Sequence, residues 1–110
     1  MDENKTELVG RVVDLAGLLD YQSGAVVSNT IIKEQVGTVT LFAFDQGQEF
    51  SEHSTPFDAL VQIIDGEMEI TLSGTPHRVK AGEMLIMPAD VPHALTAISK
   101  AKMLLVMIRA

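Results

Sequence analysis

The stretch of residues 52–66, EHSTPFDALVQIIDG, contains the features on which the fold assignment depends. His53 opens a run of small and polar residues. The run becomes apolar and strand-like over residues 58–64, and it ends at Asp65-Gly66, a dipeptide typical of a tight turn. The stretch therefore raises the question of whether His53 is one ligand of a site or a surface residue at the mouth of a loop. The chain has 3 histidines to answer it with, at positions 53, 77 and 93.

Short β-strands are predicted on both sides of this stretch. Residues 67–72, EMEITL, alternate cleanly between apolar and polar side chains, so this strand is expected to bury one face only. Further strand-like segments lie at residues 25–34, 36–44, 77–80, 83–88, 91–98 and 102–110. About nine or ten short strands, with turn signals every 8–12 residues or so, predict an all-β sandwich or barrel. Residues 11–19 are ambiguous and allow a short strand followed by a helical turn.

Length and composition limit the classes of protein that remain. A chain of 110 residues, 46% of them hydrophobic, is long enough for one domain with its own core. We expect residues 1–8 to be a polar tail and residues 9–110 to be a single barrel domain. The net charge of −7 argues against nucleic acid and anionic membranes as partners. The absence of cysteine excludes disulfides and thiolate metal sites, and with no secretory signal or membrane span recognisable, a cytoplasmic protein is the expectation.

Two glycine-anchored motifs surround the histidines at 53 and 93. The first runs from Gly47 through His53 to Gly66, and the second runs from Gly82 through Pro88 to His93. This arrangement resembles the cupin superfamily. Its first motif reads G, five residues, H-x-H, three or four residues, E, six residues, G, and its second reads G, five residues, P-x-G, two residues, H, three residues, N. The resemblance covers residues 47–97, about half of the chain, and implies a single-domain antiparallel jelly-roll β-barrel.

The resemblance also implies a ligand set, which this chain retains only in part. In metal-binding cupins three histidines and one glutamate hold a divalent metal inside the barrel mouth. His53 and His93 occupy two of these positions, whereas Thr55 and Ala59 stand at the positions of the second histidine and of the glutamate. Asp90 stands at the glycine of P-x-G, and Ala97 stands at the final asparagine. The ligand pocket is therefore expected to comprise His53, Thr55, Ala59 and His93.

Asp58 is a tentative third metal ligand beside His53 and His93. It lies one residue before the vacant glutamate position, and the family motif allows the spacer to vary by one residue. Strand alternation would direct Asp58 outward, but a bulge near Pro56 could turn it inward. A His–Asp–His set would suit Fe, Mn, Ni or Zn. The alternatives remain that the two histidines are structural, that Asp58 is a solvated strand-start residue, and that no metal binds. His77 is expected to lie far from the mouth.

Three functions follow from these observations. The first is a small barrel protein that binds a small molecule, a divalent metal, or both at the barrel mouth. The second is a metal-dependent enzyme of the dioxygenase, isomerase or decarboxylase type acting on a small organic acid. The third is a non-catalytic structural or partner-binding module. The resemblance further implies a homodimer, because free-standing single-barrel cupins usually dimerise. No residue pattern identifies a substrate or decides whether the protein is an enzyme.

Overall fold

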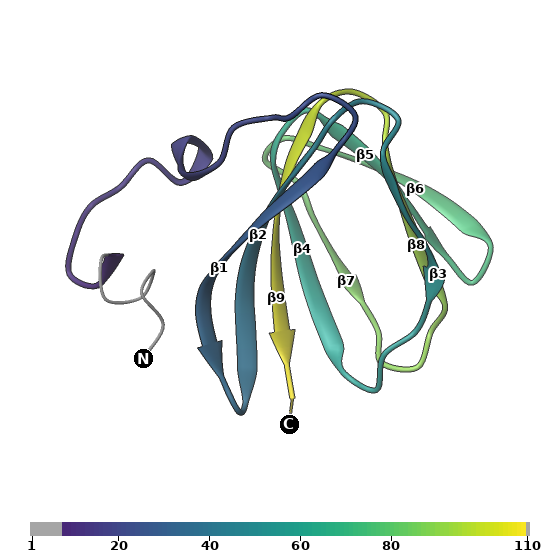
Figure 1. Ribbon diagram of the computed structural model, residues 1–110. Helices are drawn as coiled ribbons and strands as arrows, with labels where there is room; N and C mark the ends of the chain where they lie inside the picture. The colour runs from purple at the N-terminus through teal and green to yellow at the C-terminus, as the bar shows by residue number, and fades with distance from the viewer. Residues whose placement is uncertain (1–7, 110) are drawn as a thin grey trace.

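Two antiparallel β-sheets face each other in the computed structural model, which describes residues 8–109 (Figure 1). The five-stranded sheet has the order β1-β2-β9-β4-β7, and the four-stranded sheet has the order β3-β8-β5-β6. The predicted all-β, jelly-roll type of fold is confirmed. The expected polar tail, residues 1–8, lies almost entirely outside the described residues.

The strands follow one another along the chain with short connections. Their bounds are β1 Val26–Glu34, β2 Gly37–Phe44, β3 Glu49–His53, β4 Asp58–Asp65, β5 Glu67–Leu72, β6 Thr75–Lys80, β7 Met84–Met87, β8 His93–Ala97 and β9 Ala101–Ile108. A single turn of 3-10 helix, η1, spans Leu15–Leu18. No helix among residues 8–109 is long and apolar enough to cross a membrane.

Two segments differ from the sequence-based expectation. β3 was not among the predicted strands, because its side chains are mostly exposed and show no apolar alternation; it is an edge strand of its sheet. The strand considered for the first part of residues 11–19 does not form, and only the helical turn η1 is present. Within residues 8–109 no strand pairs with the residues before η1, so their apolar side chains alone do not produce a β-strand.

The Asp65-Gly66 signal marks a corner between the sheets and not a hairpin. β4 belongs to the five-stranded sheet and β5 to the four-stranded sheet, so the chain changes sheet at this point. Gly66 has φ +73°, and a Cβ placed there would lie 1.9 Å from the carbonyl oxygen of Lys100. The corner therefore requires glycine on both conformational and steric grounds. A tight hairpin does form at Ser73-Gly74, between β5 and β6, where both φ values are positive, at 48° and 82°, as a primed turn demands.

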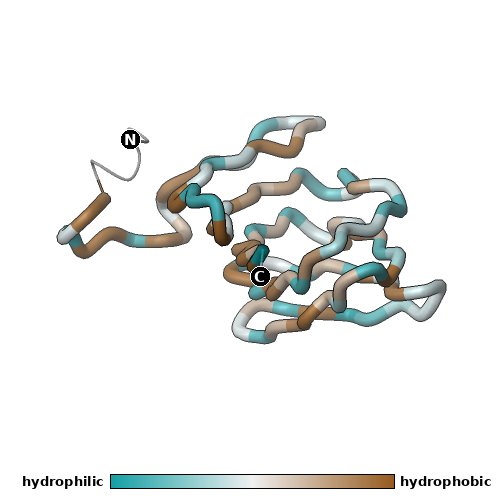
Figure 2. Tube along the Cα trace, turned by 90° about the horizontal axis from the view of Figure 1, so that it is seen from below, coloured by the Kyte–Doolittle hydropathy of each residue, from teal (hydrophilic) through white to brown (hydrophobic). Residues whose placement is uncertain are grey.

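The core fills the space between the two sheets. Its members are apolar side chains on the inner faces: Phe44, Ala59, Val61, Ile63, Met68, Ile70, Val79, Met87, Leu95, Ala97, Ala101 and Met103. The predicted alternation of β5 is confirmed, because Met68 and Ile70 are fully buried. Figure 2, seen from below, shows the hydrophobic and hydrophilic residues alternating along much of the two sheets.

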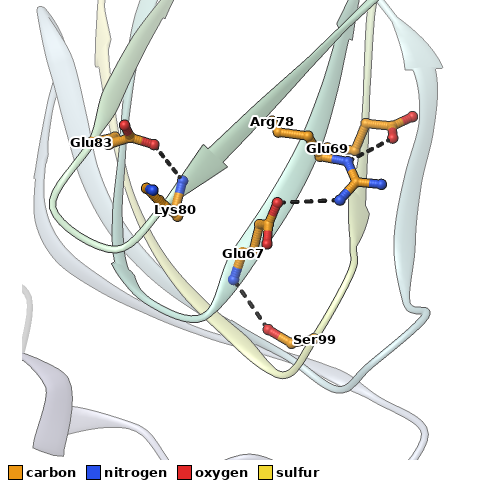
Figure 3. Close-up of polar contacts among 6 residues, drawn as sticks. All are labelled: Glu67, Glu69, Arg78, Lys80, Glu83 and Ser99. Carbon is orange, nitrogen blue, oxygen red and sulfur yellow. Dashed lines mark hydrogen bonds and ion pairs between the residues drawn. The ribbon is translucent and has the colours of Figure 1, made fainter.

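The outer face of the four-stranded sheet is polar (Figure 3). Arg78 on β6 donates from Nε to Glu69 at 3.1 Å and from Nη1 to Glu67 at 3.2 Å, across the strand pair β5–β6. The backbone N–H of Glu67 donates to Ser99 Oγ at 3.1 Å. We call Glu67, Glu69 and Arg78 the outer ion cluster.

Candidate functional site

A cavity of about 190 Å³ lies between the sheets, at the end where the β3–β4 and β7–β8 connections meet. These two connections are joined by a backbone hydrogen bond from Asp90 N–H to the Thr55 carbonyl oxygen, at 2.7 Å. All four residues of the predicted ligand pocket line the cavity. The full lining is Phe42, Phe50, His53, Thr55, Ala59, Met87, His93, Leu95, Met103, Leu105 and Met107.

His53 and His93 form a close pair at this cavity. They are directly opposite each other in the pairing of β3 with β8, where the register shifts between Phe50 and His53. Their Nε2 atoms are 3.1 Å apart, and their ring centroids are separated by 4.3 Å with an interplanar angle of 72°. The two imidazoles thus lie on facing strands, close enough to share one ion or water.

The backbone determines which nitrogen of each imidazole is free. His53 Nδ1 lies 2.8 Å from the Ser51 carbonyl oxygen, and His93 Nδ1 lies 3.2 Å from that of Val91. A carbonyl oxygen can only accept, so both Nδ1 atoms carry hydrogen and donate. The two Nε2 lone pairs therefore converge, and the pair can accommodate one proton or one cation between these atoms, but not two protons.

His93 is more deeply buried than His53. Its side chain is 4% exposed, whereas His53 is exposed at the strand end. Burial lowers the pKa of His93 below its ordinary value of 6.5, because an imidazolium loses hydration there. The neighbouring His53 lowers the pKa of His93 further by charge repulsion, while the hydrogen bond to the Val91 carbonyl opposes the shift.

The two replaced ligand positions leave the rest of the cavity apolar. The Thr55 hydroxyl donates to the Phe57 carbonyl oxygen at 3.2 Å, so its hydrogen is already used. Ala59, on β4, is 3% exposed and presents only a methyl group to the cavity. Polar groups therefore gather at the histidine pair, and the β4 wall offers none at this position.

Asp58 does not join the histidine pair, which corrects the expected third ligand. β4 pairs with β9 in continuous register from Asp58 to Ile63, so the bulge that would turn Asp58 inward is absent. Its exposed carboxylate accepts from the backbone N–H of Ala89 at 2.8 Å and thus binds the β7–β8 connection. Within residues 8–109, no group of three or more histidine, cysteine, aspartate or glutamate side chains is placed to hold a metal ion.

Sequence reasoning did not identify the aromatic part of the lining. Phe42 and Phe50 line the cavity and meet edge to face, with ring centroids 5.4 Å apart. Aromatic residues are scarce in this chain, and Phe50 lies within the first motif, between Gly47 and His53. Met87, Met103 and Met107 also line the cavity, whereas Met84 is exposed.

Two further residues considered in the sequence are Asp90, at a motif position, and His77, outside the motifs. Asp90 has φ +64°, so the glycine position of the P-x-G motif keeps its left-handed backbone although aspartate occupies it. Aspartate is among the few non-glycine residues that tolerate this region. His77 lies on β6 and is not part of the cavity lining.

The donor set fits a divalent metal only in part. Two imidazoles with free Nε2 atoms, each oriented by a carbonyl that accepts from Nδ1–H, are typical metal ligands with their supporting contacts. The nitrogen separation of 3.1 Å suits two ligands of one ion. Tight sites, however, use three or four protein ligands, and Thr55 and Ala59 supply neither an imidazole nor a carboxylate.

Comparisons with known proteins agree with this architecture. The family model of the cupin domain matches residues 40–109. A conserved Streptococcus pyogenes protein of unknown function is 38% identical, with a TM-score of 0.88 over 92% of this chain and 89% of that one. A cupin 2 conserved barrel domain protein from Leptotrichia buccalis is 36% identical, with a TM-score of 0.84 over 87% of this chain and 47% of that one. A cupin superfamily protein from Desulfitobacterium hafniense is 27% identical, with a TM-score of 0.87 over 92% of this chain and 93% of that one. No curated protein matches the chain.

Proposed function

This chain belongs to the cupin family, and from that premise we propose that it binds a small molecule in its cavity. The apolar part of the molecule contacts the phenylalanine, leucine and methionine side chains, and its polar group meets the imidazoles of His53 and His93. The observation that carries the proposal is the contact of 3.1 Å between the two Nε2 atoms at an otherwise apolar cavity. A concave apolar space with a few converging polar groups is the general form of a ligand site.

The size of the cavity limits the ligand. Its volume of about 190 Å³ is below the roughly 300–1,000 Å³ of pockets that take drug-sized molecules. The ligand is therefore a compact molecule with one polar end. The flexible methionine side chains on the wall, Met87, Met103 and Met107, can adjust to its shape.

The histidine pair determines which polar group the ligand can carry. Its two Nε2 atoms accept a hydrogen bond when neutral, and they donate one when the pair carries a proton. A hydroxyl or carboxyl group can satisfy both states, since its oxygen accepts and its O–H donates. We therefore expect an oxygen-bearing head group, of the kind found in a small organic acid or alcohol.

A thermal-shift and NMR screen would test the proposal. The probes are carboxylic acids and alcohols of about four to eight carbons, straight-chain and aromatic, added to chelator-treated protein. We expect at least one probe to raise the melting temperature and to shift the resonances of His53 and His93. His53→Gln and His93→Gln should weaken its binding at least about tenfold, because each removes one of the converging nitrogens.

His77→Gln is the matched control for this screen. It removes the one other histidine of the chain, which lies outside the cavity lining. Binding should be unchanged in this variant. If all three variants bind the probe like the wild type, or if no probe of this class binds, the proposed site is wrong.

A divalent metal at the same pair is the second candidate. The carbonyl contacts that leave both Nε2 atoms free favour it. Its remaining coordination positions would be left to water or to an oxygen of the ligand. Such an ion would supply Lewis-acid chemistry for the alternative of an isomerase or decarboxylase of small organic acids, and a redox-active ion such as Fe would be required for a dioxygenase.

Metal analysis separates the two candidates. Untagged wild-type protein, His53→Ala and His77→Ala would be purified without chelator and assayed for Fe, Mn, Ni and Zn. A metal near one per chain that is lost in His53→Ala and kept in His77→Ala supports the metal centre. Metal-free protein that does not take up these ions would reject it and leave the small-molecule proposal standing.

A further inference from the structure

Two hydrogen bonds, which we call the clasp, join the β3–β4 connection and the start of β4 to the β7–β8 connection. The backbone N–H of Asp90 donates to the Thr55 carbonyl oxygen at 2.7 Å. The N–H before it, that of Ala89, donates to Oδ1 of Asp58 at 2.8 Å. The first bond joins two backbone groups, so no side-chain substitution removes it directly. The second depends on the Asp58 side chain, so one substitution can remove it.

Asp58 lies where the backbone pairing between β4 and β7 stops. The last pair of that register is Ala59 opposite Met87. One step further, the same register would place Asp58 opposite Pro88, which has no N–H to donate. The Asp58 carboxylate accepts the next N–H along the chain, that of Ala89. The side chain therefore extends the attachment between the two strands into the β7–β8 connection.

Strand pairing holds β4 on both sides, whereas it holds β3 on one side only. β4 lies between β9 and β7 in the five-stranded sheet, and Asp58 itself pairs with Ile108 of β9. β3 is an edge strand, and its register with β8 shifts between Phe50 and His53. An irregular register interrupts the ladder of hydrogen bonds locally. Strand pairing therefore constrains His53 less than it constrains Asp58.

Each imidazole of the histidine pair is oriented by its own backbone segment. His53 Nδ1 donates to the Ser51 carbonyl oxygen of β3 at 2.8 Å. His93 Nδ1 donates to the Val91 carbonyl oxygen of the β7–β8 connection at 3.2 Å. The contact of 3.1 Å between the two Nε2 atoms therefore requires a fixed separation of these segments. The clasp acts close to both rings, because Thr55 lies just after His53 and Val91 follows the two N–H donors of the clasp.

We propose that Asp58 is the positioning residue of the histidine pair. Through the N–H of Ala89 it holds the β7–β8 connection against β4, and it thereby maintains the separation at which both Nε2 atoms converge. Asp58 is not part of the cavity lining, so it acts through the connection and not on the ligand. Contacts that orient binding groups in this way contribute strongly to affinity. The consequence for ligand binding rests on the proposed function, whereas the geometry of the pair exists without ligand.

Glu83, at the other end of β7, provides a matched control. Its Oε1 accepts from the backbone N–H of Lys80 at 3.0 Å, a bond of the same kind as that between Ala89 and Asp58 (Figure 3). Both carboxylates belong to exposed residues, and Glu83 lies outside the cavity lining. Loss of either bond should therefore cost a similar amount of stability, but only the loss at Asp58 should disturb the histidine pair.

NMR of the ligand-free, chelator-treated protein tests the positioning role directly. In the wild type we expect nuclear Overhauser contacts between the ring protons of His53 and His93, whose ring centroids are 4.3 Å apart. Asp58→Ala should weaken or abolish these contacts. Asp58→Asn should retain them, because its amide oxygen still accepts the N–H of Ala89. Asp58→Leu has a similar shape without an oxygen, so it should behave like Asp58→Ala and replaces that variant if it does not fold. Glu83→Ala should match the wild type.

Titration with hexanoate and with hexanol measures the consequence for binding. Asp58→Ala should raise the dissociation constant roughly tenfold, whereas Asp58→Asn and Glu83→Ala should stay near the wild type. Unchanged ring contacts or unchanged affinity in Asp58→Ala would overturn the positioning role. An Asp58→Asn variant as impaired as Asp58→Ala, or an equal effect of Glu83→Ala, would overturn it as well. If these and the other acids and alcohols fail to bind the wild type, the proposed function is wrong, while the ring contacts still decide whether Asp58 positions the pair.

Discussion

The two faces of the four-stranded sheet both carry titratable side chains, which are buried on the inner face and exposed to water on the outer face. On the inner face, His93 is buried beside His53, and desolvation lowers its pKa. On the outer face, the side chains of Arg78, Glu67 and Glu69 are 56%, 37% and 35% exposed and form ion pairs. Hydrogen bonds from Arg78 to Glu67 and Glu69 raise the pKa of Arg78, so the charges there complement one another.

The difference shows why the histidine pair, and not the outer ion cluster, is the candidate site. The outer charges already satisfy each other, are screened by water and salt, and add little to stability. The Nε2 atoms of His53 and His93 converge beside an apolar cavity. A hydrogen bond from a polar ligand to these atoms is stronger there than it would be in water. Whether a polar residue can serve as a binding group therefore depends on the face of the sheet that it occupies, and not on the number of charges nearby.

The sharpest test of this contrast uses two neighbouring residues of β5. Ile70 points inward and is fully buried, whereas Glu69 points outward. Ile70→Ala should lower the free energy of unfolding by about 3 kcal/mol, because it removes buried carbons and leaves a cavity. Glu69→Ala should cause a much smaller loss. Urea denaturation of both variants measures the difference, and equal losses would contradict the assignment of the faces.

A second test places a carboxylate on the inner face of the other sheet. Ala59→Glu would direct a carboxylate into the cavity that contains the histidine pair. Without metal we expect a loss of roughly 2 kcal/mol in unfolding free energy, since the charge is poorly hydrated there. Adding Zn²⁺ or Mn²⁺ should restore stability and give near-stoichiometric binding, because three ligands then converge.

Ala59→Gln is the control for the added carboxylate. It has nearly the same shape as glutamate but no charge, so it should gain little affinity for the metal. Metal titration of both variants measures the difference. Equal metal uptake by Ala59→Gln and Ala59→Glu would show that residue 59 does not face the histidine pair.

The pH dependence of stability provides a third test. In the unfolded chain His93 regains its ordinary pKa of 6.5, whereas in the folded chain burial holds it lower. At pH values between these two pKa values, the unfolded state binds a proton that the folded state does not bind. The contribution of His93 is therefore complete above pH 6.5 and decreases as the pH falls towards the lower, folded pKa.

Urea denaturation between about pH 7.5 and 5.5, with chelator present, would measure this effect. We expect His93→Gln to reduce the loss of stability on acidification relative to the wild type. His77→Gln, outside the cavity, should keep the wild-type profile. A His93→Gln profile parallel to that of the wild type would show that His93 is not desolvated in the folded chain.

The smallest effect is expected on the outer face. Arg78→Ala breaks both ion pairs of the outer ion cluster, but its charge is exposed to water. We expect a urea midpoint within the experimental error of the wild type, at low and at high salt. A clear loss of stability at low salt that disappears at high salt would mean that this cluster contributes more than its exposure suggests.

Much of the candidate site was predictable because its signals are local. The motif spacings placed His53 and His93 in one ligand pocket, and the two imidazoles do face each other. The orientation of Asp58 was less predictable, because it depended on a possible bulge; the regular register with β9 decided it. The cavity walls come from strands far apart in the sequence, which is why Phe42 and Phe50 were not foreseen as its lining.

The sequence by itself determined the all-β fold, the position of most strands and the pairing of two histidines in one family frame. These properties follow from alternation along a strand, from turn residues and from motif spacing, all of which are short-range. The tertiary structure alone decided that Gly66 turns a corner between sheets and that Asp58 points away from the cavity, toward the β7–β8 connection. These properties depend on which strands become neighbours, a long-range choice that no single segment contains.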